Sequence, residues 1–169
     1  MFGYDATAMK GLIWEVIVEN IAVETQEWLQ KMGDTQNGAA NFNTAFILTP
    51  RKTGKAIIQF REAEKEKLSA IRPGFSIDGW AVDRLCRVWL LLQLDATDKD
   101  KYFRTIENLF LSAEMNELVA LYSSLPLLAY PEIWVKRCAE GIRHRAGKFA
   151  EGASQPSGDR RAKNRQPGR

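Results

Sequence analysis

The 169-residue sequence contains little histidine and little cysteine. Its single histidine, His144, excludes a histidine-rich metal site and any mechanism that needs two histidines. Two cysteines, Cys86 and Cys138, are too few for a secreted disulfide framework, so we expect both to be reduced and buried. The sequence has no signal-peptide pattern and no apolar run near the roughly 20 residues that a transmembrane helix needs. These absences predict a cytoplasmic protein without a transmembrane segment.

Positive charge is concentrated at one end of the chain. Residues 143–169 carry eight basic and two acidic residues, whereas residues 1–142 carry sixteen basic and nineteen acidic residues. Because no predicted helix gathers basic residues on one face, we expect no specific nucleic-acid partner. The end segment also contains a single large apolar residue, Phe149, which is too little to form a core. We therefore predict one all-helical domain in residues 1–143 and a disordered basic tail in residues 144–169.

Apolar residues recur at helical spacing through residues 1–143, and no segment alternates strictly between apolar and polar residues. The helix over residues 76–94 is apolar on nearly all sides, so we expect it to be central and the most buried. From that helix onward, the helices form two pairs of about HEAT-repeat length. The sequence predicts an all-α fold, and both an irregular α-solenoid of HEAT-like helix pairs and a compact helical bundle fit it. The predicted helices cover residues 5–32, 41–49, 57–71, 76–94, 98–112, 114–125 and 131–143.

The last two predicted helices each carry an apolar stripe that we expect to face the core. A place on such a stripe favours a buried core thiol for Cys138 over a catalytic nucleophile. No residues have the spacing of a metal site, a phosphate-binding loop or a cofactor motif, so the sequence predicts no catalytic residue, metal or cofactor. The stripes contain Met115, Leu118, Val119 and Tyr122 in the first helix, and Trp134, Cys138, Ala139 and Ile142 in the second.

One block of sequence, EMNELVALYSSLPLL over residues 114–128, resembles the signature of the EboA-domain family. The similarity continues through Tyr130-Pro131-Glu132 and AEGIR over residues 139–143. Supporting matches are Phe42-Asn43-x-Ala45-Phe46 followed by Pro50-Arg51 and Gly54-Lys55, and Trp80-x-x-Asp83-Arg84-x-x-Arg87. The resemblance covers roughly residues 10–143.

This resemblance implies a place in a small gene cluster that serves the trafficking or export of a secondary metabolite. It implies other ebo-cluster proteins as partners, including a membrane prenyltransferase-like protein. Independently of the resemblance, the planar donor fork of Arg51 and the aromatic surface expected nearby suggest a small aromatic or acidic metabolite as ligand. No catalytic residue is established for the EboA member, so none is carried over. Family members continue past the Gly-Ile-Arg element with further helices, where this sequence has its basic tail. We therefore expect a C-terminally truncated or frame-shifted version.

Our leading hypothesis is a non-catalytic helical binding or scaffold protein in metabolite trafficking. The alternatives are a small enzyme or enzyme subunit acting on the same metabolite, and an RNA- or membrane-surface binder that acts through its tail. The helices that begin near residues 76, 114 and 131 should bring polar groups to one edge, where a metabolite or partner would bind. The competing interpretation is that these groups pair with one another, Asp83 with Arg87 and Glu117 with Arg84. The candidate surface consists of Arg51, Asp83, Arg84, Arg87, Glu114, Asn116 and Glu117.

Overall fold

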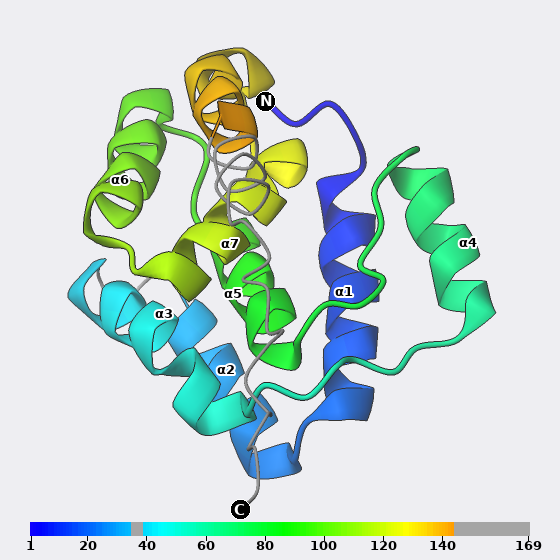
Figure 1. Cartoon of the computed structure of the whole chain (residues 1–169). Coiled ribbons are helices and arrows are strands. Elements are labelled where there is room, and N and C mark those ends of the chain that lie inside the picture. The colour runs from blue at the N-terminus through cyan, green and yellow to red at the C-terminus, as the bar shows by residue number, and fades with distance from the viewer. Residues whose placement is uncertain (35–38, 144–169) are drawn as a thin grey trace, which may run out of the picture.

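The computed structural model describes residues 1–34 and 39–143, and its regular elements are helical (Figure 1). The α-helices are α1 (Ala6–Asn20), α2 (Val23–Gly33), α3 (Ala39–Thr53), α4 (Glu62–Ile71), α5 (Val82–Leu92), α6 (Lys99–Ser112) and α7 (Met115–Ser124). The 3-10 turns η2 (Leu125–Leu127) and η3 (Pro131–Trp134) follow, and η3 leads into a helix over residues 135–143. The predicted all-α class is confirmed, since the described ranges contain no sheet and only an isolated bridge between Ile57 and Ala81. The predicted tail, residues 144–169, lies outside these ranges.

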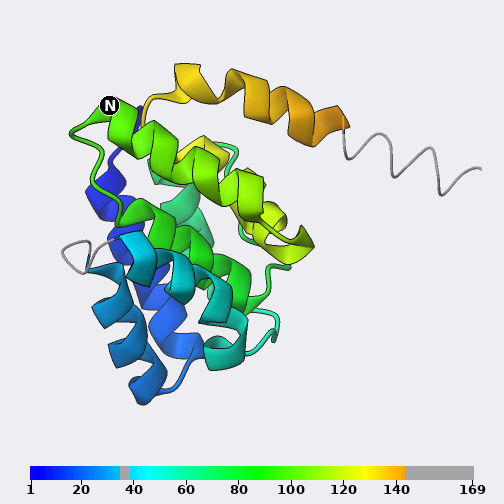
Figure 2. The same ribbon diagram turned by 90° about the vertical axis from the view of Figure 1, so that its left-hand side faces the viewer.

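Helix α5 is the centre of the fold. All of its residues except Arg84 are buried, which confirms the prediction of a central, most buried helix. It contacts α1, α2, α3 and α7, and these helices surround it in both views (Figure 2). In a solenoid a helix touches only its neighbours along the chain, so contacts with both halves of the chain indicate a compact bundle. No helix in the described part of the chain is long and apolar enough to cross a membrane.

The helix predicted over residues 5–32 is interrupted at Ile21, between α1 and α2. At this break, the side-chain amide of Gln26 donates to the Val18 carbonyl at 3.1 Å and to the Ile21 carbonyl at 3.0 Å. This side chain thus satisfies carbonyls that a continuous helix would bond through its backbone, and the helix ends here without proline or glycine.

Residues 56–61 are extended and lie against the segment that precedes α5. The Ile58 N–H donates to the Trp80 carbonyl at 2.9 Å, and Gly79 turns the chain with a φ of 72°. Backbone groups that bond across two segments cannot also bond within a helix. The helices predicted from residues 57 and 76 therefore begin later, at the starts of α4 and α5.

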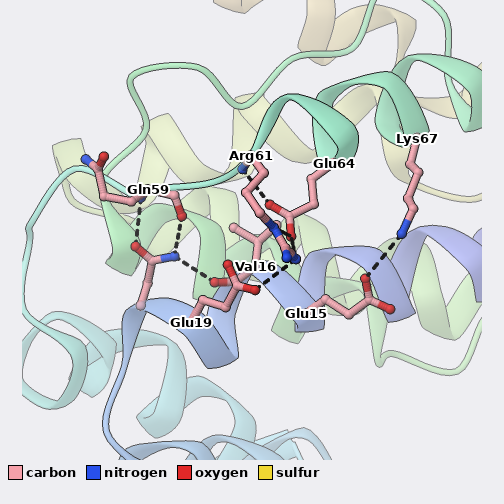
Figure 3. Close-up of polar contacts among 8 residues, drawn as sticks. Glu15, Val16, Glu19, Gln59, Arg61, Glu64 and Lys67 are labelled. Atoms are coloured by element: carbon pink, nitrogen blue, oxygen red, sulfur yellow. Dashed lines mark hydrogen bonds and ion pairs between the residues drawn. The ribbon is translucent and has the colours of Figure 1, made fainter.

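A polar seam fastens this extended segment and α4 to α1 (Figure 3). The Asn20 side chain both donates to and accepts from the backbone of Gln59, each at 2.8 Å. The carboxylate of Glu64, which is 1% exposed, accepts the Arg61 backbone N–H at 2.7 Å and pairs with the Arg61 guanidinium. That guanidinium also lies 3.0 Å from the carboxylate of Glu19 on α1. The seam positions the loop that leads from α3 to α4.

Helix α3 does not stop at Pro50, where the sequence predicted its end, but runs on to Thr53. Pro50 has no N–H to give to the carbonyl of Phe46, one turn earlier. Arg87 of α5 takes its place, because its Nε–H donates to that carbonyl at 2.8 Å. The proline is thus accommodated inside α3, and the additional turn carries Arg51.

The helix over residues 135–143 packs on α6 and α7 through a charged side chain and a glycine. The Arg137 guanidinium pairs with Glu107 of α6 at 2.6 Å and lies against the ring of Phe110 at 4.6 Å. Gly141 lies so close to α7 that a Cβ atom there would be 2.8 Å from the Tyr122 ring. Cys138, Ala139 and Ile142 of the predicted apolar stripe therefore point away from α6 and α7, whereas Trp134, which precedes this helix, packs against Phe103 of α6.

The two predicted stripes are largely exposed, which corrects the expectation that they face the core. Helix α7 buries Ala120 and Leu121 instead of its predicted stripe. The prediction of a buried Cys138 is wrong, because the side that packs holds Arg137 and Gly141. Of the stripe residues, Trp134 is buried, Leu118 and Tyr122 are half-buried, and Met115, Val119, Cys138, Ala139 and Ile142 are exposed.

Candidate functional site

A cavity of about 340 Å³ lies between the last turn of α3 and the first turn of α7, with α5 beneath it. Its volume is at the lower end of the range typical of small-molecule sites, about 300–1,000 Å³. Five of the seven candidate residues line it, whereas the helix that begins near residue 131 contributes none. The lining residues are Ile47, Pro50, Arg51, Lys55, Arg87, Ser112, Glu114, Asn116 and Glu117.

Arg87 forms the floor of the cavity and is 2% exposed. Its Nη1 lies 3.0 Å from Oδ2 of Asp83, and its Nη2 lies 3.7 Å from Oε1 of Glu117. Burial lowers the pKa of Arg87, and the two carboxylates counteract that lowering. Asp83 and Arg87 are therefore buried partners and not parts of an open surface, and the Asp83–Arg87 pair of the competing interpretation is present.

Arg84 points away from the cavity. Its Nε donates to the Ser123 hydroxyl at 2.8 Å, and its guanidinium lies 4.0 Å from the centre of the Trp80 ring. Burial lowers the pKa of Arg84. The predicted pair between Glu117 and Arg84 is wrong, because Glu117 pairs with Arg87 from the next turn of α5.

The wall on the α3 side is cationic. Arg51 stands in the last turn of α3, and Lys55 follows Gly54, whose φ of 74° turns the chain after the helix. Both side chains are exposed, and neither has a hydrogen-bond or ion-pair partner among residues 1–34 and 39–143. Lys55 was not among the candidate residues, although it belongs to the Gly54-Lys55 element that supports the family resemblance. Ile47, one turn before Arg51, is 59% exposed and adds an apolar surface.

The wall on the α7 side is acidic. The Glu117 carboxylate accepts the backbone N–H of Glu114 at 3.0 Å, which is half of a capping box and holds Glu117 at the start of the helix. Glu114 and Asn116 are exposed on the same turn. Glu117 therefore caps the start of α7 and, together with Glu114, also lies beside the cavity.

The chemistry that this site offers is hydrogen bonding and charge pairing. Arginine presents a planar fork of donors to a carboxylate, and lysine adds a compact positive charge. In the part of the chain that the structure describes, no three His, Cys, Asp or Glu side chains are placed to hold a metal ion. The groups around the cavity are thus suited to binding a small polar molecule.

Comparison with known proteins agrees with the similarity of the 114–128 block. The family model described as "Metabolite traffic protein EboA" matches residues 9–149, a range that contains every residue lining the cavity. No curated protein and no solved structure is detectably similar to the chain. A match over most of the 169 residues shows the family. The chain belongs to the EboA family of metabolite traffic proteins.

Proposed function

We propose that this protein is a non-catalytic binding protein of an ebo-type gene cluster, and that the cavity between α3 and α7 holds a secondary metabolite during its trafficking or export. The observation that carries this proposal is the pair of cations, Arg51 and Lys55, which stand at the cavity without partners in the described residues. An acidic group of the metabolite would supply the missing negative charge. Other ebo-cluster proteins, among them a membrane prenyltransferase-like protein, would deliver or receive the ligand.

The position of Arg51 in the last turn of α3 supports this proposal. Arg87 of α5 bonds the Phe46 carbonyl that Pro50 leaves free, and this contact fastens that end of α3 to the centre of the fold. Ile47 and Pro50 lie beside Arg51 and offer apolar surface to the body of a ligand. A molecule with an acidic group and an apolar or aromatic body fits this combination.

The proposal can be tested by substituting the two cations in the native host after its own copy is deleted. We expect Arg51→Ala and Lys55→Ala together to reduce the exported fraction of the metabolite, measured by chromatography of cells and medium. The melting temperature should stay nearly unchanged, because both side chains are exposed and unpaired in the described residues. Normal export by the double variant would contradict the proposal.

Lys52→Ala is the matched control. This lysine is adjacent to Arg51 in α3, but its ammonium lies 5.8 Å from the centre of the Trp28 ring and does not line the cavity. It should leave export unchanged. The same experiment tests the enzymatic alternative: failed trafficking retains the finished metabolite inside the cell, whereas failed catalysis accumulates a chemically different precursor.

A further inference from the structure

The cavity carries charges of opposite sign on its two facing walls. The α3 side supplies Arg51 and Lys55, and the α7 side supplies Glu114 and Glu117. Among the described residues, no ion pair of 4.0 Å or less joins one wall to the other. The two walls are therefore close enough to enclose one cavity and too far apart to neutralise each other directly.

The floor does not cancel the acidic wall. Arg87 is already bonded to Asp83 at 3.0 Å and to the Phe46 carbonyl at 2.8 Å. Its distance of 3.7 Å to Glu117 is longer than a hydrogen bond. One buried cation thus faces two carboxylates, so this group has a formal charge of −1, and Glu114 adds a second negative charge at the cavity.

A ligand with only one kind of charge would leave one wall without a partner. A simple anion would pair with Arg51 and Lys55 but would lie beside Glu114 and Glu117, and like charges in a partly enclosed site repel. A simple cation would face the opposite problem. A molecule that carries both charges satisfies both walls, and the exposed amide of Asn116 can bond to either group.

From this charge arrangement we infer that the cavity selects a zwitterion of the amino-acid class, with its carboxylate on Arg51 and Lys55 and its ammonium on Glu114 and Glu117. The side group of such a ligand would lie on Ile47 and Pro50, which favours an apolar one. The inference rests on the proposed function, because it assigns a ligand class to the same cavity.

Titration of the full chain with three matched probes tests this inference by nuclear magnetic resonance of the backbone amides. The probes are phenylalanine, 3-phenylpropionate, which lacks the ammonium, and 2-phenylethylamine, which lacks the carboxylate. We expect phenylalanine to shift the amides of Arg51, Lys55 and Asn116 and to bind about three- to fivefold more tightly than either analogue, as each partly exposed ion pair contributes modestly.

Two variants assign the charges. Arg51→Gln should weaken phenylalanine and phenylpropionate and leave phenylethylamine unchanged, whereas Glu114→Gln should weaken phenylalanine and phenylethylamine and leave phenylpropionate unchanged. The controls are Lys52→Gln and Glu24→Gln, which remove charges from α3 and from the first turn of α2, outside the cavity. Both should bind all three probes as the wild type does.

The outcomes separate this inference from the proposed function. Phenylpropionate binding as tightly as phenylalanine, with no response to Glu114→Gln, would overturn the zwitterion and keep an anion-binding cavity. Absence of any probe-induced shift at the cavity, together with lost export in the Arg51→Ala and Lys55→Ala variant, would also overturn the zwitterion and keep the proposed function. Absence of shifts together with normal export would overturn both.

Discussion

Replacing Arg87 by methionine should strongly destabilise the protein even though Arg87 lines the candidate site. Methionine retains the apolar stem of arginine but removes the guanidinium that bonds Asp83 and the Phe46 carbonyl. Asp83 and Glu117, which are 5% and 9% exposed, would then be buried carboxylates without a cation. Because Pro50 cannot donate to it, the Phe46 carbonyl would also lose its partner.

The size of the effect follows from this burial. Breaking a buried ion pair by removing one partner costs about 3–5 kcal/mol, because the remaining charge stays desolvated. The whole fold is expected to be stable by roughly 5–15 kcal/mol, so this loss is a large share of the total. At about 2–4 °C per kcal/mol, the melting temperature should fall by about 6–20 °C.

Urea unfolding followed by circular dichroism at 222 nm measures this loss. Arg84→Met is the matched control on the same helix, and it should cost only about 1 kcal/mol, because Arg84 is partly exposed and bonds Ser123. Adding Asp83→Asn and Glu117→Gln to Arg87→Met should recover part of the stability by removing the unpaired charges. An Arg87→Met protein within about 1 kcal/mol of the wild type would refute the reasoning. Failure of the added substitutions to restore any stability would assign the loss to packing.

Three further predictions concern the rest of the fold. Leu92 is 1% exposed, so Leu92→Asp should abolish the cooperative thermal transition, and an ordinary melting curve would place the core elsewhere. Burial raises the pKa of Glu64, but the hydrogen bonds from Arg61 outweigh it and hold that pKa below its usual range. The stabilisation that comes from this lowered pKa is complete above the pKa of about 4.3 that Glu64 has in the unfolded chain. It is lost as the pH falls through the lower pKa of the folded protein. The difference in free energy of unfolding between the wild type and Glu64→Gln should therefore shrink as the pH falls from 6 to 3. A difference that stays constant would contradict the contacts assigned to Glu64 in the polar seam. Cys138 is exposed, whereas Cys86 is buried and burial raises the pKa of its thiol. A thiol reagent should therefore label one cysteine per native chain of the wild type and none in Cys138→Ser. Labelling of both cysteines in the native wild type would mean that α5 is accessible to the reagent.

The sequence predicts the features of this fold that depend on local spacing. The all-α class and the burial of α5 follow from apolar residues at helical intervals, which each segment displays by itself. Helix starts depend on partners far away in the chain. The Ile58 N–H is bonded to the carbonyl of Trp80, and no local pattern reveals such a pairing.

In the candidate site, too, local spacing predicts some features and contacts between distant residues determine the others. Asp83 and Arg87 are four residues apart and share a face of α5, whereas Arg84 lies about 100° around the helix from Asp83 and points to α7 residue Ser123. Helical geometry separates Arg84 from Asp83, but Arg84 is three residues from Arg87, so only its contact with Ser123 shows that it leaves this group. The position of Arg51 could not be predicted, because the carbonyl that Pro50 leaves free in α3 is bonded by Arg87, which is distant in the sequence. The outward orientation of Cys138 likewise depends on the ion pair between Arg137 and Glu107, which is distant in the sequence.

The central claim, that this metabolite traffic protein holds its ligand between α3 and α7, is tested most directly by mass spectrometry of small molecules that co-purify with the full chain from its native host. We predict that one metabolite is recovered with the wild type and with Lys52→Ala, and that it is lost from the Arg51→Ala and Lys55→Ala double variant, whose melting temperature is unchanged. Recovery of the same metabolite in equal amounts from all three proteins, or of none from the wild type, would contradict the claim.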